Sequence, residues 1–138
     1  MTESHAGGCL CRKIRYRVSG RPNWVAYCHC TDCRRSSAAP VSLFVGLNDA
    51  QYTIATGVPA DYPSSEGVVR SFCRDCGTPL TYRSRRFPGE VHVLIGSLDE
   101  PENFPPTAHV WVSEKLPWFD TTDHLRRLAR SGADEPKP

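Results

Sequence analysis

Seven cysteines gathered into three tight groups constrain this chain of 138 residues more than any other feature. The groups are a C-x-C pair, a C-x-C-x-x-C group and a C-x-x-C pair: Cys9 and Cys11; Cys28, Cys30 and Cys33; Cys73 and Cys76. Thiols so close in sequence reach one point only where the backbone turns sharply. Gly77, directly after the last pair, suits such a turn because glycine tolerates a positive φ. Thiolates that converge in this way are typical zinc ligands.

A structural zinc site takes four protein ligands, so the seven thiols divide most simply into four and three. The first and last groups together, the four-cysteine cluster, predict one closed site that ties the first strand to the middle of the domain. The middle group, the cysteine triad, predicts a second ion with an open fourth position, which is typical of a catalytic zinc. We therefore expect two zinc ions per chain.

The fourth ligand at the cysteine triad is left open by the sequence. His29 lies between two of the cysteines and Asp32 directly precedes the third, so either could complete a closed, purely structural site. Against this, successive side chains of an extended chain point to opposite sides, so His29 would point away from an ion held by its neighbours. His109 is expected to be an exposed or hydrogen-bonded histidine rather than a ligand.

Composition and charge argue against several classes of protein. No segment approaches the roughly 18 consecutive apolar residues of a membrane span, and the polar N-terminus MTESHAGG lacks the pattern of a signal peptide. We therefore expect a cytoplasmic protein with reduced thiols, and an odd number of cysteines also argues against a complete disulfide framework. A net charge of +2 gives no reason to expect nucleic acid or a membrane as the partner.

The hydropathy pattern predicts a mostly β domain. Residues 13–18 alternate, with Ile14, Tyr16 and Val18 on one face. Further strands are expected at residues 41–47, 52–55, 68–72, 80–82, 91–95 and 108–112. Two short helices are expected, at Thr31–Ala39 and Thr122–Arg130. Residues 1–130 are expected to form a single domain, followed by a flexible C-terminal tail at residues 131–138.

Four sequence blocks carry a resemblance to a known family: GGCLCRKIRYRVSG, CHCTDCRRSS, FCRDCGTPLTY and HVWVSEKLPWFD. Over residues 7–128 the chain resembles the family of glutathione-dependent formaldehyde-activating enzymes and centromere protein V. The resemblance implies a zinc-stapled, Mss4-like β-sandwich of short antiparallel strands with few short helices. It also implies a structural zinc at the four-cysteine cluster and a catalytic zinc at the cysteine triad. The family pattern suggests a glycine directly after the RRSS segment, where this chain has Ala38 and Ala39.

The reaction that the resemblance implies is that of a carbon–sulfur lyase, which reversibly joins formaldehyde to the small thiol glutathione and gives S-hydroxymethylglutathione. The thiolate is the nucleophile in such chemistry, and a zinc ion with an open position favours it. Three thiolates already outweigh the charge of Zn²⁺, so a fourth calls for nearby cations. Arg34 and Arg35 directly follow Cys33 and could supply that charge or pair with glutathione carboxylates. An ordinary solvated arginine pair is the alternative.

A second class of function also fits the sequence, namely a non-catalytic zinc-binding module that binds protein or nucleic acid. The basic face of the first predicted strand, with Lys13, Arg15 and Arg17, favours it. Such faces are commonly only solvated, and no aromatic residues interleave with this one as single-strand binding prefers. Metal content measured together with thiol accessibility separates the two classes of function.

Overall fold

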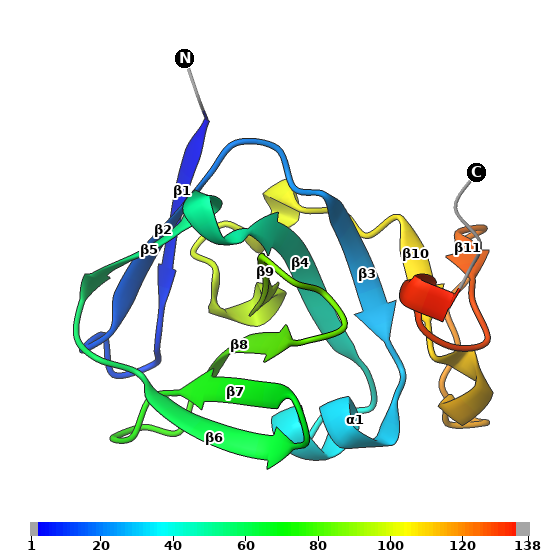
Figure 1. Ribbon diagram of the computed structural model, residues 1–138. Coiled ribbons are helices and arrows are strands. Elements are labelled where there is room, and N and C mark those ends of the chain that lie inside the picture. Colours follow the sequence, from blue (N-terminus) through cyan, green and yellow to red (C-terminus); the bar gives the residue numbers. More distant parts are fainter. Residues whose placement is uncertain (1–2, 135–138) are drawn as a thin grey trace.

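Two β-sheets and a single α-helix make up residues 3–134, the part of the chain that this computed structural model describes (Figure 1). The three-stranded sheet has the order β1-β2-β5, and the eight-stranded sheet has the order β11-β10-β3-β4-β9-β8-β7-β6. The strands are β1 (Ser4–Gly8), β2 (Arg15–Ser19), β3 (Trp24–Cys28), β4 (Ser42–Asn48), β5 (Tyr52–Thr56), β6 (Ala60–Ser65), β7 (Val68–Phe72), β8 (Pro79–Ser84), β9 (Glu90–Leu94), β10 (Ala108–Val110) and β11 (Arg126–Arg127). The α-helix is α1 (Thr31–Ser37), and short 3-10 helices span Asp49–Gln51, Ile95–Ser97, Pro101–Asn103, Val112–Glu114 and Gly132–Asp134.

The first predicted strand anchors the three-stranded sheet to the core. Ile14, Tyr16 and Val18 are all buried, as their alternation predicts. The hydroxyl of Tyr16 lies 2.7 Å from Oγ of Ser97, so both polar groups are satisfied inside the protein. The same core cluster contains Val45 from the eight-stranded sheet, so the two sheets share one core.

Strand β4 occupies the centre of the eight-stranded sheet and pairs antiparallel with β3 and β9. Its residues are buried almost without alternation, because both faces of the strand are covered. In the pairing with β3, Gly46 lies opposite Trp24, and the indole fills the space that a side chain at position 46 would need.

The C-terminal part of the chain returns to the edge of the eight-stranded sheet. Strand β10 lies between β3 and β11 and pairs with both in parallel. The resemblance implies antiparallel strands throughout, and these two pairs differ from it. Parallel neighbours need a long connection, and here residues 29–107 separate β3 from β10. This return places β10 beside the end of β3, where the cysteine triad begins (Figure 1).

The predicted helix at Thr122–Arg130 is wrong. This segment contains only the short strand β11, and the rest of its backbone is irregular. The side chain of Asp123 accepts a hydrogen bond from the N–H of Leu125 at 3.0 Å, a local contact that competes with helix formation. The N–H of Leu128 donates to the carbonyl of His109 at 2.8 Å, so pairing with β10 gives the backbone partners that a helix would have supplied.

The mostly β class with few short helices is confirmed, although some elements differ from the prediction. The predicted helix at Thr31–Ala39 is present as α1, which ends at Ser37 because Ala38 adopts a left-handed conformation with φ of 54°. Strands β1, β3 and β6 were not predicted. No helix within residues 3–134 is long and apolar enough to cross a membrane.

The predicted tail at residues 131–138 is partly described by the structure. Residues 132–134 form a 3-10 helix, in which Asp134 makes an ion pair with Arg86 at 2.7 Å. Ser131 is buried. Residues 135–138 lie outside the described residues, as do residues 1–2 of the predicted domain.

Replacing Gly46 with alanine should destabilise the protein. The added Cβ would lie 2.2 Å from Cε2 and 2.5 Å from Nε1 of Trp24, so the indole or strand β3 must shift. Overpacking of this kind costs about 1–3 kcal/mol, which chemical denaturation measures as a lower free energy of unfolding. Gly96→Ala is the matched control, because its Cβ would meet nothing within 4 Å. Equal stability of the two variants would contradict the prediction.

Candidate functional site

The four-cysteine cluster joins two turns that are distant in sequence. Cys9 and Cys11 lie in the turn between β1 and β2, and Cys73 and Cys76 lie in the turn between β7 and β8. The four Sγ atoms lie within 4.8 Å of one another, with 3.5 Å between Cys9 and Cys11 and 3.8 Å between Cys11 and Cys73. A tetrahedral ion with Zn–S bonds of about 2.3 Å holds its sulfurs about 3.8 Å apart. The cluster could therefore hold a metal ion that ties the two sheets together.

Local hydrogen bonds explain how these thiols converge. Gly77 has a φ of 81°, and its N–H donates to the carbonyl of Cys73 at 2.8 Å, which confirms the predicted tight turn. The hydroxyl of Thr78 lies 3.3 Å from Sγ of Cys76. Hydrogen bonds from Thr78, first from its hydroxyl and then from its N–H, lower the pKa of Cys76 to about 5. The turn thus stabilises the thiolate, which is the form that binds a metal ion.

The cysteine triad lies where β3 passes into α1, on a segment that we call the metal loop (residues 28–33). Cys28 is the last residue of β3. Cys30 caps α1 by accepting a hydrogen bond from the N–H of Cys33 at 3.3 Å. The three Sγ atoms lie within 4.8 Å of one another. Cys28 and Cys33 are buried and Cys30 is half-buried, so solvent reaches the triad at Cys30.

Crowding of the three thiols favours a bound cation. Hydrogen bonds from Cys28, and then from Cys33, lower the pKa of Cys30 to about 3. Hydrogen bonds with Cys30 and then Cys33, followed by burial, raise the pKa of Cys28 above its usual value. One thiolate therefore forms at the expense of its neighbours, and a divalent ion would remove this conflict. The all-sulfur donor set and its spacing suit zinc.

No fourth His, Cys, Asp or Glu joins the triad among residues 3–134. His29 is directed to the other side of the metal loop, where its Nε2 lies 2.9 Å from Nδ1 of His109. Asp32 is exposed at the start of α1. Within the described residues the triad therefore offers three protein ligands and leaves one position of a tetrahedral ion for another molecule.

Arg34 and Arg35, which were predicted to balance the charge of the triad, lie on α1 beside it. The guanidinium of Arg34 donates to the carbonyl of His29 at 3.3 Å and to the carbonyl of Glu114 at 3.3 Å. These contacts fasten the backbone of the metal loop. Arg35 is exposed. A contact of either arginine with a substrate stays a prediction.

Arg70 on β7 is a cation that the structure brings to the triad and that the sequence analysis missed. Its Nη1 and Nη2 lie 3.7 and 3.8 Å from Sγ of Cys33. Its Nε donates to Oγ of Ser64 at 3.1 Å, and its guanidinium carbon lies 5.0 Å from the ring centroid of Tyr82. Within the described part of the chain Arg70 forms no ion pair with a carboxylate, so its charge is available to the thiolates. The signal for it was an arginine in the middle of an apolar strand, VVRSF.

Apolar side chains surround the buried part of the triad. Phe44 packs with Cys28 and Cys33 in one cluster, and residues from several elements cover it: Trp24, Tyr82, Leu94, Val110 and Trp111. Trp111 adopts a left-handed backbone conformation, with φ of 58°, directly after β10. Such a conformation costs a non-glycine residue free energy, and here it accompanies a side chain placed against the triad.

Comparisons with known proteins agree with this arrangement. Residues 4–114 match the family described as glutathione-dependent formaldehyde-activating enzyme, and the chain belongs to this family. A Schizosaccharomyces pombe protein named as an uncharacterized lyase is 25% identical over 116 residues, which cover 84% of each chain. The matches support an enzyme of the lyase type.

A solved structure shows a similar fold. The crystal structure of a Rhodobacter sphaeroides protein superposes with a TM-score of 0.58 and 21% sequence identity, covering 68% of this chain and 87% of that chain. At this identity the likeness concerns the fold alone.

Replacing Cys76 with serine should unfold or severely destabilise the protein. An ion at the four-cysteine cluster contributes its binding free energy to folding, and here it would join the two sheets. Thermal melting followed by circular dichroism, with metal content measured by mass spectrometry, checks this. A soluble variant that melts cooperatively at the parent temperature would refute the assignment.

Replacing Cys30 with serine should lower the metal content by about one ion and leave the β-domain folded. Cys30 is half-buried at the start of α1, and its loss separates no sheet from the core. The same two measurements apply. If Cys30→Ser collapses as badly as Cys76→Ser, the triad is a structural site.

Proposed function

We propose that this protein is a zinc-dependent carbon–sulfur lyase that reversibly joins a small thiol, glutathione, to formaldehyde. The observation that carries the proposal is a group of three thiols with no fourth protein ligand among residues 3–134, next to a guanidinium without a carboxylate partner there. Membership of the formaldehyde-activating family and the lyase name of one relative support it. We further propose a cytoplasmic location, where such thiols stay reduced.

The proposed reaction forms one carbon–sulfur bond. The thiol sulfur adds to the carbonyl carbon of formaldehyde, the carbon–oxygen π bond breaks, and the proton of the thiol ends on the new hydroxyl oxygen. The product is S-hydroxymethylglutathione, and the reverse reaction releases both substrates. No oxidant or reductant is required.

The residues of this chain divide the work between ligation and charge balance. When bound at the triad, zinc would supply an open position that favours the thiolate form of the incoming thiol. Arg70 holds a positive charge against Cys33, which offsets the excess negative charge of several sulfurs in one place. The apolar side chains around Phe44 keep water from the buried side, so this charge interaction is screened less than at the surface.

The four-cysteine cluster serves a different purpose in this proposal. It would hold a structural zinc, because all four ligands come from the protein and two of its thiols, Cys9 and Cys73, are buried. Its place between the two sheets makes it a fastening of the fold rather than a site for substrate.

Exchange NMR with ¹³C-formaldehyde and glutathione tests the activity, since the enzyme must accelerate an addition that also occurs without it. We expect acceleration that depends on the triad ion and is lost in Cys33→Ser. A panel of other thiols, run under the same conditions, identifies the preferred one. Two bound zinc ions without acceleration for any thiol would refute the lyase and favour a non-catalytic zinc-binding module.

Replacing Arg70 with glutamine should lower kcat/KM by roughly 10- to 100-fold, because a hydrogen bond to a charged group is worth about 1.5–3 kcal/mol. Arg70→Lys keeps the charge and should retain part of the activity. Arg17→Gln is the matched control, since Arg17 is exposed on β2 and contacts Oγ of Ser4 at 3.1 Å. A loss in Arg17→Gln equal to that in Arg70→Gln would show that only net charge matters.

A further inference from the structure

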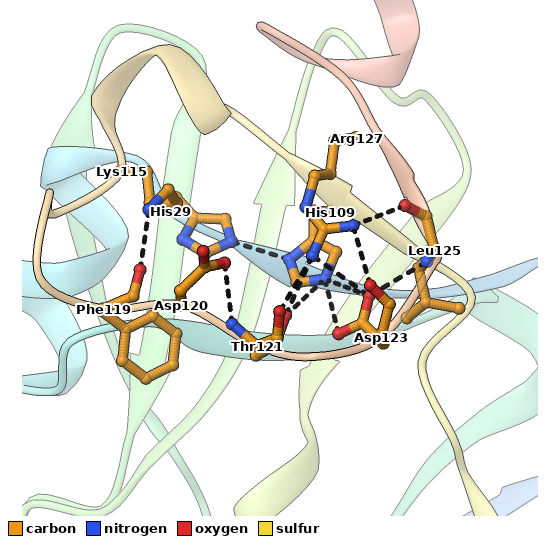
Figure 2. Close-up of polar contacts among 9 residues, drawn as sticks. All are labelled: His29, His109, Lys115, Phe119, Asp120, Thr121, Asp123, Leu125 and Arg127. Atoms are coloured by element: carbon orange, nitrogen blue, oxygen red, sulfur yellow. Dashed lines mark hydrogen bonds and ion pairs between the residues drawn. The ribbon is translucent and has the colours of Figure 1, made fainter.

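Two histidines and an aspartate, His29, His109 and Asp123, form a hydrogen-bonded chain (Figure 2). His29 lies between Cys28 and Cys30 of the cysteine triad. Nε2 of His29 lies 2.9 Å from Nδ1 of His109, and Nε2 of His109 lies 3.1 and 3.2 Å from the two carboxylate oxygens of Asp123. His29 is 1% exposed and His109 is 2% exposed, so both imidazoles are interior groups. Asp123 lies beyond residues 4–114, the part that matches the family.

The carboxylate of Asp123 fixes the direction of every hydrogen bond in the chain. Hydrogen bonds with the hydroxyl of Thr121, and then with the N–H of Leu125, hold the pKa of Asp123 below its usual value, so it is an acceptor. The Nε2–H of His109 must then donate to it, which leaves Nδ1 of His109 as an acceptor. The Nε2–H of His29 donates to that atom, and both rings are held in one orientation.

This chain lies on the opposite side of β3 and β10 from the triad. In the parallel pairing, Val110 lies opposite Cys28 and packs in the triad's apolar cluster. His109 lies opposite Tyr27 instead and stacks on it, with ring centroids 4.5 Å apart and an angle of 11° between the planes. Because side chains alternate, His29 shares the side of His109. His29 is therefore a tether of the metal loop and not one of its ligands.

Further hydrogen bonds fasten the same loop to the segment after β10. The N–H of His29 donates to the carbonyl of Val110 at 3.1 Å. The N–H of Thr31 donates to Oε1 of Glu114 at 2.9 Å. The chain through Asp123 adds a side-chain anchor between Cys28 and Cys30, at the one position where both neighbours carry thiols of the triad.

Stability alone does not account for a histidine at position 29. Its Nδ1 is buried and has no hydrogen-bond partner among the described residues. A buried polar atom without a hydrogen-bond partner destabilises the folded protein, and an apolar side chain at this position would avoid that loss. The hydrogen bond from His29 to His109 therefore indicates that a histidine is kept here because it holds the metal loop in place.

We propose that Asp123 and His109 are positioning residues for the cysteine triad. Acting through His29, they hold the peptide between Cys28 and Cys30 so that the two thiols keep the spacing a metal ion needs. The inference rests on the proposed function in one respect, namely that the triad binds an ion. Residues that orient metal ligands from outside typically change metal affinity about 10- to 100-fold.

Cobalt(II) binding to the full chain tests this inference without measuring activity. Visible absorption of thiolate-bound Co²⁺ reports the geometry of each site, and competition with a chelator gives each affinity. Asp123→Asn should lower the affinity of the cysteine triad for Co²⁺ by about tenfold or more and alter the spectrum of that ion. The ion at the four-cysteine cluster should be unchanged. Asp123→Glu, which keeps a carboxylate, should recover part of the affinity.

Asp134→Asn is the matched control, because Asp134 anchors the same C-terminal segment through Arg86 at 2.7 Å and has no bond to either histidine. An equal loss of Co²⁺ affinity at the triad in this control would overturn the positioning role. An unchanged affinity and spectrum at the triad in folded Asp123→Asn would also overturn it. If Asp123→Asn does not fold, Thr121→Val removes a hydroxyl 3.4 Å from Nε2 of His109 and is judged by the same readouts. A parent protein that binds one Co²⁺ only would overturn the proposed function as well, before any variant is made.

Discussion

Thiols crowded within 4.8 Å of one another set the conditions that the rest of this structure meets. Neighbouring thiolates repel one another. Neither the four-cysteine cluster nor the cysteine triad therefore ionises fully unless positive charge or hydrogen-bond donors offset this repulsion. The protein supplies such groups from nearby and from distant elements. Thr78 donates to Cys76 within the same turn, whereas Arg70 reaches Cys33 from another strand. The ionisation of each group, and hence its capacity for a metal ion, is therefore a property of the tertiary fold.

The four-cysteine cluster and the cysteine triad lie at different kinds of place in the fold. The four-cysteine cluster joins the β1–β2 turn to the β7–β8 turn, so it links the three-stranded sheet to the eight-stranded sheet. The cysteine triad lies at the end of one strand and the start of one short helix, where a missing ligand disturbs few neighbours. Closed coordination suits the first position, where four thiols converge, and an open coordination position suits the second, where three thiols lie beside Arg70.

Local patterns in the sequence were sufficient for the cysteine groups and for much of the β-structure. The alternation of Ile14, Tyr16 and Val18 predicted their burial, and Gly77 predicted its turn. Strand β6, with the sequence ADYPSS, carries no apolar alternation and exists because β7 pairs with it. The segment at Thr122–Arg130 has helical spacing of its leucines, but Asp123 is drawn to His109 and the backbone pairs with β10. Arg70 and Asp123 reach the site through pairings between distant strands, which a single sequence does not encode locally.

The parallel insertion of β10 between β3 and β11 also bears on how the protein is made. The bond from His29 to His109 joins residues 80 positions apart, so the metal loop leaves the ribosome long before the segment that fastens it. The four-cysteine cluster is complete once residue 76 has emerged. Contacts between distant parts of a chain form slowly, because the intervening loop must close first. All three thiols of the triad are present once residue 33 has been made, whereas the anchor of the metal loop is complete only when His109 and Asp123 have emerged. The final position of the metal loop is therefore set only after nearly the whole chain has been synthesised.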